Sequence, residues 1–425
     1  MDIHSLANMD IGASKQQSNF AKAQKPRSAT HQSKPNEVNS DPCTTCAQAC
    51  PKPILICTEC ADGTDQHGTA TTTIYCDTKC RAADTKHAEL CAVNNQQKEL
   101  HRAGEILQSI WFIWRELAFD MKLSHIEKKK AASGEDLLFF HEGDYTDHNE
   151  GPLFPLPAFA NMDEKDKQAV ITLNSCGDAM GYLHGLSKKL LAGISDGIWE
   201  NYAAVKESDY YVHQVRCTGE PFRFSPIHQY LTTRLSTNGE IYVLDPSGAQ
   251  LGQHQAVLAP GRRLQWMTNN VQVAEHGACA VNVAAIRKRH PDDAEPSTDF
   301  RVGHVQEAVC QKVMKVVEVW EQSRTSLQQL RREDRTQYIT ARDSLLGLIR
   351  VSLRKWVADY TSGAITVHIP EYQRPGPDTF RPTEYIQPKA GNSKKRNDGV
   401  DPSDICGTPQ FFAKLASQGV NIHYA

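Results

Sequence analysis

The sequence predicts an α+β protein in which a small cysteine-rich module precedes a mixed body with long flanking helices. Eight of the 13 cysteines lie between Cys43 and Cys91. The stretch that follows switches between helical and strand-like hydrophobic periods, and two long helical patterns close it. A chain of 425 residues is long enough for two or three such units, each with its own core.

Both ends of the chain are expected to lie outside any core. Residues 1–42 are rich in Ser, Gln, Asn and Lys and hold almost no large apolar side chains, so we predict a disordered arm. Residues 366–425 are rich in Pro, Gly and Lys. They predict a mostly flexible tail with one short helix near Gln410–Ser417.

Composition excludes several classes of protein. No run of eighteen apolar residues occurs, so we expect no membrane span. The N-terminal MDIHSLANMDIGASKQQS has no apolar core and predicts no secretory signal, which indicates an intracellular protein of the nucleus or cytoplasm. A formal net charge of -3 gives no bulk electrostatic case for nucleic-acid binding.

The body, residues 96–300, mixes helical and extended patterns. The expected elements are a helix over 96–130, an extended segment over 134–145, a helical pattern over 163–192, and strands over 209–217 and 226–245. The dipeptide Asn238-Gly239 favours a hairpin turn within the last of these. Residues 301–365 predict two helices whose Val and Trp seams pack into the core.

The cysteine-rich module, residues 43–91, contains four pairs of metal-ligand residues. They follow the order C-x2-C, C-x2-C, C-x3-C and H-x3-C: Cys43, Cys46, Cys57, Cys60, Cys76, Cys80, His87 and Cys91. In a reducing compartment such a cluster indicates metal binding and not disulfides. Seven thiolates and one imidazole complete two tetrahedral shells, so we predict two structural zinc ions without an open coordination position. Zinc would also supply the folding free energy that this segment, poor in apolar residues, lacks.

The order and spacing of these pairs resemble the MYND-type zinc finger. Tyr75 is the aromatic residue that precedes the third pair, and Asp84 is the acidic residue before the fourth. The resemblance implies cross-bracing, in which the first and third pairs bind one zinc (Cys43, Cys46, Cys76, Cys80) and the second and fourth bind the other (Cys57, Cys60, His87, Cys91). It also implies a protein partner, including short proline-containing peptides, and a regulatory or scaffolding role such as transcriptional regulation.

The module departs from the MYND pattern at two points. The gap Ala61–Tyr75 is long and rich in Thr and Gly, so we expect a flexible excursion. Thr85 stands where the family commonly has Trp. Cys50 lies between the pairs, either as a spare exposed thiol or as a substitute ligand for Cys46. Within residues 43–91 six acidic side chains outnumber four basic ones, which favours a protein partner over nucleic acid.

One pattern in the body is similar to the His-Asp half of papain-like transferases and peptidases. His228 opens one predicted strand, Asp245 closes the next, and Cys176 precedes them as the candidate nucleophile. If the hairpin turns at its Asn-Gly dipeptide, however, Asp245 faces Thr232 and lies about 13 Å along the ladder from His228. Cys176 also falls within a continuous helical pattern, which favours a packed core thiol. The sequence therefore favours a catalytically silent body and a non-enzymatic function, with a papain-like Cys-His-Asp acyl transferase or hydrolase as the alternative.

Overall fold

The computed structural model describes residues 42–50, 54–131, 134–144, 151–156, 162–205, 211–222, 227–259, 267–287, 300–369 and 422–423. The arm expected before residue 42 and the helix expected near Gln410–Ser417 lie outside these residues. The chain divides into a small unit, Met1–Thr58 with Thr72–Lys86, and a large unit, Glu59–Thr71 with His87–Ala425. In the part of the chain that is described, no helix is both long and apolar enough to cross a membrane.

The small unit contains a two-stranded antiparallel sheet and one short helix. Strand β1 (Leu55–Ile56) pairs with β2 (Ile74–Tyr75), and α1 (Thr78–Ala83) follows directly. The side chain of Asp77 caps α1 by accepting a hydrogen bond from the backbone N–H of Cys80 at 2.8 Å. The buried Tyr75 hydroxyl donates to Asp84 Oδ2 at 3.1 Å, so the aromatic and acidic residues of the MYND pattern contact each other.

The main sheet of the large unit is antiparallel, with strand order β11-β10-β5-β7-β8-β9. The strands are β5 (Ser195–Val205), β7 (Ile227–Leu235), β8 (Ile241–Leu244), β9 (Val257–Leu258), β10 (Met267–Glu275) and β11 (Ile422–His423). Strands β7 and β8 form the predicted hairpin. Strands β5 and β10 have no counterpart among the predicted elements.

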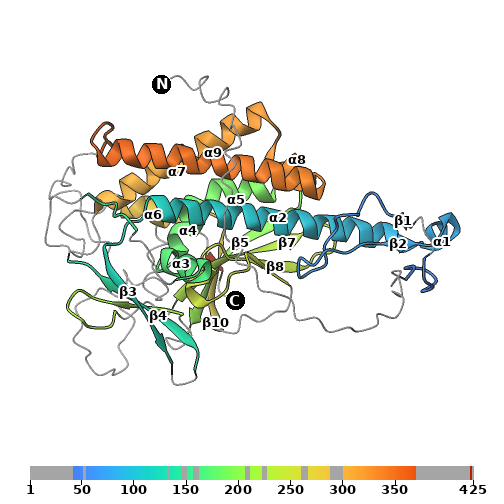
Figure 1. The fold of residues 1–425 in the computed structure, drawn as a ribbon, viewed down its shortest axis with the longest axis horizontal. Coiled ribbons are helices and arrows are strands. Elements are labelled where there is room, and N and C mark those ends of the chain that lie inside the picture. Colours follow the sequence, from blue (N-terminus) through green and yellow to red (C-terminus); the bar gives the residue numbers. More distant parts are fainter. Residues whose placement is uncertain are drawn as a thin grey trace, which may run out of the picture. The chain divides into compact units, whose positions relative to one another are not determined.

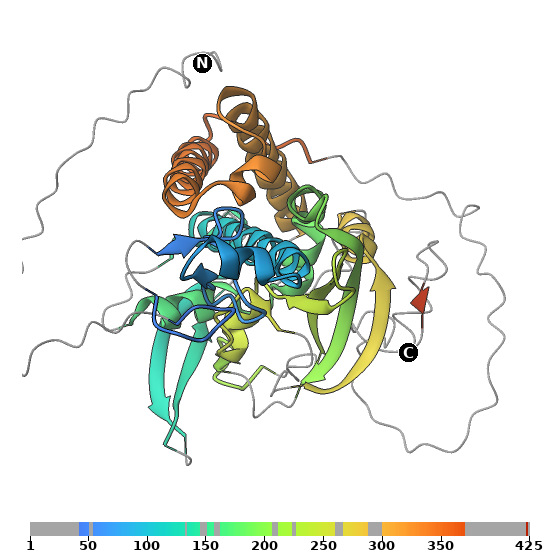
Figure 2. The same cartoon turned by 90° about the vertical axis from the view of Figure 1, so that its right-hand side faces the viewer.

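A second sheet joins β3 (Leu123–Lys130), β4 (Asp136–Glu142) and β6 (Val212–Val215), and its β3–β4 hairpin extends away from the helices (Figure 2). The prediction of one helix through residue 130 is wrong, because α2 (His87–Leu117) ends earlier and the three lysines belong to β3. Lys128 and Lys130 on this edge strand form ion pairs with Asp136 across the hairpin. Pairing with β4 therefore outweighs the helical pattern that precedes it.

Helices cover one side of the main sheet, where α2, α5, α7 and α9 lie together (Figure 1). The remaining bounds are α3 (Glu164–Ile171), α4 (Cys176–Tyr182), α5 (His184–Leu191), α6 (Ala278–Ile286), α7 (Phe300–Ser323), α8 (Leu327–Arg332) and α9 (Arg335–Thr361). The Val and Trp seam of α7 is buried in the core, as predicted, and ends at the fully buried Trp320. Trp114 of α2 donates to Gln306 of α7 at 2.6 Å, which satisfies its indole N–H within this core.

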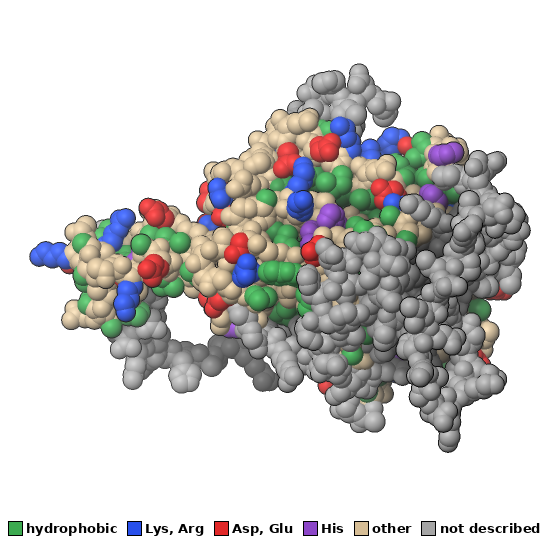
Figure 3. All heavy atoms as spheres, turned by 180° about the vertical axis from the view of Figure 1, so that it is seen from behind, with side chains coloured by type: hydrophobic (Ala, Val, Ile, Leu, Met, Phe, Trp, Pro, Cys, Tyr) green, Lys and Arg blue, Asp and Glu red, His purple; other side chains and the backbone are tan. Residues whose placement is uncertain are grey.

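Ion pairs join neighbouring helices at the surface of the large unit. Arg350 of α9 pairs with Glu116 of α2 at 2.8 Å, and Lys189 of α5 pairs with Glu321 of α7 at 3.0 Å. Figure 3 shows basic and acidic side chains interspersed on the face that it draws. Among the described side chains on that face, the two signs of charge do not separate into large patches.

The pattern over 163–192 forms three helices and not one. Helix α3 ends at Ile171 with Thr172 as its C-cap residue, and Asn174 adopts a left-handed φ of 53°, a conformation that cannot continue a helix. Helix α4 then begins at Cys176, after Ser175 as its N-cap residue. The predicted continuous helix is therefore wrong at the candidate nucleophile itself.

Candidate metal centres and a candidate catalytic site

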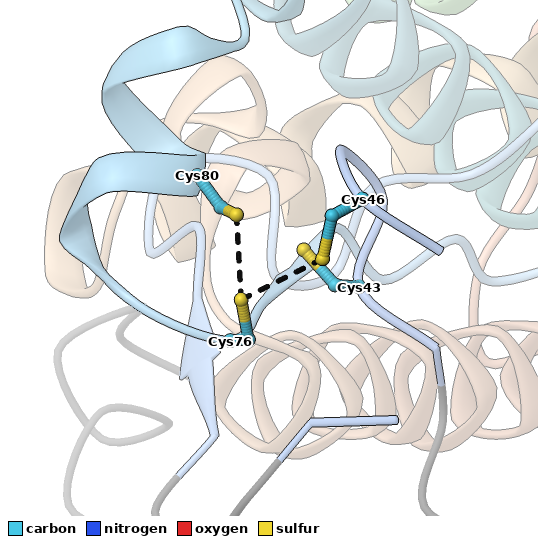
Figure 4. A group of neighbouring side chains, drawn as sticks. All are labelled: Cys43, Cys46, Cys76 and Cys80. Carbon is cyan, nitrogen blue, oxygen red and sulfur yellow. Dashed lines mark hydrogen bonds between the residues drawn. The ribbon is translucent and has the colours of Figure 1, made fainter. Parts of the chain in front are cut away.

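The first candidate metal centre gathers four cysteines of the small unit, Cys43, Cys46, Cys76 and Cys80. Their sulfur atoms all lie within 4.8 Å of one another. Figure 4 shows the four side chains converging from separate segments of the chain. The first segment turns tightly, because the backbone N–H of Ala47 donates to the carbonyl of Cys43 at 2.9 Å and Ala47 has a left-handed φ of 57°.

This donor set fits zinc. A Zn–S bond of ~2.3 Å in a tetrahedron requires sulfur atoms roughly 3.8 Å apart. The Sγ atoms of Cys46 and Cys76 are 3.8 Å apart, and those of Cys76 and Cys80 are 3.3 Å apart. A hydrogen bond with the backbone of Cys46 lowers the pKa of the Cys43 thiol to about 6, whereas the hydrogen bond with Cys76 and burial raise the pKa of the Cys80 thiol. Zinc binds the thiolate, so binding would displace the protons that remain. Four thiolates could therefore hold one ion in a closed shell.

The second candidate centre gathers Cys57, Cys60, His87 and Cys91, whose ligand atoms also lie within 4.8 Å of one another. His87 and Cys91 stand one turn apart at the start of α2, so their side chains project from the same face. His87 Nε2 lies 3.6 Å from Cys60 Sγ. Three thiolates and one imidazole also form a tetrahedral donor set for zinc.

Two expectations about this module are wrong. The gap Ala61–Tyr75 is a hydrogen-bonded loop and not a flexible excursion. Within it, the side chain of Asp65 accepts from two backbone N–H groups at 2.8 and 2.9 Å, and the Thr64 N–H donates to the carbonyl of Asn94 in α2 at 3.1 Å. Cys50 is buried and not exposed, and the two ligand groups contain Cys46 and not Cys50.

His228 and Asp245 meet in the large unit, contrary to the prediction. His228 Nε2 lies 2.8 Å from Asp245 Oδ2, and both side chains are buried, at 1% and 0% exposure. Burial lowers the pKa of His228, but the charge and hydrogen bond of Asp245, together with those of Cys176, outweigh it and raise the pKa to about 10. The three residues of the alternative interpretation therefore interact.

The error in the prediction came from the hairpin register. The ladder pairs Leu231 with Leu244 and Thr232 with Val243, so Asp245 follows opposite Tyr230 and not opposite Thr232. The connecting loop has four residues, 236–239. Its Asn-Gly dipeptide forms the end of the loop and not its apex, and Gly239 has a left-handed φ of 72°. His228 and Asp245 are then diagonal neighbours on one face of the sheet, within reach of long side chains.

A buried polar network supports these residues. Ser247 donates to Asp245 Oδ1 through its backbone N–H at 3.2 Å and through its hydroxyl at 3.3 Å. Gln250, in a 3-10 turn over Gly248–Leu251, accepts from the backbone N–H of Asn174 at 3.2 Å. The Asp245 carboxylate is thus bonded at both oxygens, which fixes its orientation toward His228.

The same network reaches the segment before Cys176. The side-chain amide of Asn174 donates to Gln214 Oε1 at 3.0 Å, and Gln214 donates in turn to Glu142. Sequence reasoning missed Gln214, Glu142 and Gln250. Of these three, only Gln250 could have been noticed in the sequence, because it is a large polar residue that directly follows the turn sequence over 245–249.

Comparison with known proteins gives no match: no family model, no curated protein and no solved structure is significantly similar to this chain. The resemblance to MYND fingers therefore depends on the order and spacing of the ligands. The resemblance to papain-like enzymes depends on three side chains and their contacts.

Proposed function

We propose that the large unit is a cysteine-dependent acyl transferase or hydrolase and that the metal-binding module serves a protein partner. The observation that carries the enzymatic proposal is the buried bond between His228 and Asp245, beside Cys176 at the start of α4. A buried histidine that is held by a carboxylate and interacts with a thiol has the parts of a nucleophilic site.

The chemistry follows from the two ring nitrogens of His228. Because Nε2 bonds to Asp245, Nδ1 is the nitrogen that remains for Cys176. The Cys176 thiolate attacks the carbonyl carbon of an ester, thioester or amide, and the leaving group departs with the proton from Nδ1. This step forms a thioester on Cys176 and a neutral imidazole on His228.

The second half of the reaction regenerates the site. Neutral His228 removes a proton from the acceptor, which is water in a hydrolase or an amine or alcohol in a transferase. The acceptor attacks the thioester carbonyl, and Cys176 leaves as a thiolate beside the imidazolium. Asp245 keeps its hydrogen bond to Nε2 throughout, which holds the ring in one orientation and stabilises its positive charge.

Alkylation with iodoacetamide at neutral pH, mapped by mass spectrometry, tests the proposal. We expect Cys176 to react faster than a free cysteine, and H228A to slow its reaction by about 10²-fold or more. C217S is the matched control, because Cys217 is exposed and lies outside the network described above. Slow alkylation of Cys176 that does not depend on His228 would indicate a packed thiol and contradict the proposal.

For the module at residues 43–91, we propose two structural zinc ions and a protein-binding surface, in a regulatory or scaffolding role. Two closed four-ligand sets support the zinc proposal. The excess of acidic over basic residues in this segment opposes nucleic-acid binding. The face drawn in Figure 3 likewise has charges of both signs interspersed.

Fluorescence polarisation with the full chain tests the partner class. We expect measurable binding of proline-containing peptides that is lost in a C43S/C46S variant, and only weak binding of a DNA duplex. Tight DNA binding that falls steeply with salt concentration would contradict the proposal of a protein partner.

A further inference from the structure

The side-chain amide of Gln250 is held in one orientation by hydrogen bonds to two backbone groups, one of Asn174 and one of Ser247. Its Oε1 accepts from the backbone N–H of Asn174 at 3.2 Å, and that group can only donate. Its Nε2 donates to the carbonyl of Ser247 at 3.3 Å, and that group can only accept. The side chain is 2% exposed. The amino group therefore faces the ring of His228, and the carbonyl faces the backbone N–H of Asn174.

The amino group of Gln250 lies beside the nitrogen of His228 that serves the nucleophile. Nε2 of Gln250 is 3.5 Å from Nδ1 of His228. When His228 is an imidazolium, Nδ1 carries a proton that it donates to Cys176, so it cannot accept a hydrogen bond from Gln250. One N–H of Gln250 is engaged by Ser247, and the second lies on the side of His228 Nδ1, the nitrogen left for Cys176 once Nε2 is bonded to Asp245.

We propose that Gln250 donates this second N–H to the oxyanion that forms when Cys176 attacks a carbonyl group. The inference rests on the proposed acyl-transfer function and deepens it, because an oxyanion donor implies a substrate that reacts at a carbonyl carbon. A pre-oriented donor in a buried site stabilises the negative charge without reorganising during the reaction. Gln250 is then a catalytic residue and not only a support for Asn174.

Two reactions of the same thiol separate this role from a positioning role. Acetylation of Cys176 by p-nitrophenyl acetate passes through a tetrahedral oxyanion, whereas alkylation by iodoacetamide displaces iodide at a saturated carbon and forms none. Q250M keeps a side chain of similar length but has no donor. We expect Q250M to slow Cys176-dependent release of p-nitrophenol by on the order of 10²- to 10³-fold. Its alkylation rate should change by less than about threefold.

Q253M is the matched control, because Gln253 lies nearby in the chain and its side-chain amide donates to the carbonyl of Gln255, outside the network described above. It should leave both rates unchanged. Q250A, which removes the side chain altogether, should reproduce the split between the two reactions, and it decides the question if Q250M does not fold. Circular dichroism of each variant checks the fold.

Three outcomes count against the inference. If Q250M and Q250A slow both reactions equally, Gln250 only positions the site. If both variants acetylate at the wild-type rate, Gln250 is not an oxyanion donor, while the nucleophilic role of Cys176 remains. If release of p-nitrophenol by the wild-type chain does not depend on Cys176, the proposed function fails, and the inference fails with it.

Discussion

Asp245 Oδ2 and His228 Nε2 lie 2.8 Å apart, and both side chains are buried away from solvent. The pair connects the end of β8 to the beginning of β7, two positions that are close only in the observed register. The contact pairs the carboxylate of Asp245, which directly follows β8, with the imidazole of His228, which lies in β7. It is the relationship on which the enzymatic proposal depends.

Replacing Asp245 with Asn should lower the pKa of His228 and change how the free energy of unfolding depends on pH. His228 has a pKa raised from 6.5 to about 10 in the folded state, so its charged form stabilises the fold. That contribution is fully present below pH 6.5 and is lost as the pH rises toward 10. Urea unfolding should therefore show a difference in stability between wild type and D245N of about 3 kcal/mol at pH 6, which narrows by pH 9.5. A difference that is constant over this range would contradict an ionised His228.

The alkylation of Cys176 should depend little on pH between 7 and 9. A free cysteine reacts faster as the pH passes its pKa of ~8.5, because only the thiolate attacks. His228, whose pKa is raised to about 10 mainly by the charge and hydrogen bond of Asp245, keeps its positive charge over this range, so the charge beside Cys176 stays constant. Stopped-flow alkylation should give a flat profile for wild type and a rising one for H228A. Cys217, which is exposed, supplies the comparison within the same chain.

The purified chain should contain two zinc ions, one for each ligand group. H87A removes one ligand of the second group and should leave about one zinc per chain, measured by inductively coupled plasma mass spectrometry. H125A, which replaces a histidine of β3 outside both groups, should retain both ions. Circular dichroism should show that the fold after Gly151 survives in H87A. One zinc or none in the folded wild-type chain would overturn the two-ion proposal.

Asn174 tests the break that separates α3 from α4. A φ of 53° strains the backbone of a residue that has a Cβ atom. At Asn174 the hydrogen bond from its side chain to Gln214 compensates for this strain. N174A should lower the free energy of unfolding by about 2 kcal/mol, since it loses the bond and keeps the strain. N174G loses the bond but removes the strain, so it should be more stable than N174A by about 1 kcal/mol. Equal losses in urea unfolding would mean that the left-handed backbone carries no cost.

The sequence determined the features that depend on local spacing. The eight ligand positions follow from pairs two or three residues apart, and the structure gathers those same eight side chains into the two predicted groups. The helical seam of α7 and the existence of the β7–β8 hairpin were also predictable, because hydrophobic period and an Asn-Gly dipeptide act within a few residues.

Only the tertiary structure decided the features that depend on register and on pairing partners. The hairpin loop has four residues and not the two that an Asn-Gly turn predicts, and this difference moves Asp245 along the ladder toward His228. The loop length cannot be deduced from the residue types in the loop alone. Asn174 breaks a helical pattern that continues on both sides of it, because its left-handed backbone is compensated by Gln214, forty positions away in the sequence. Gln250 faces His228 because its amide is oriented by the nearby carbonyl of Ser247 and by the backbone N–H of Asn174, 76 positions away in the sequence. Contacts of this kind arise between distant segments, so they exist only once the chain has folded.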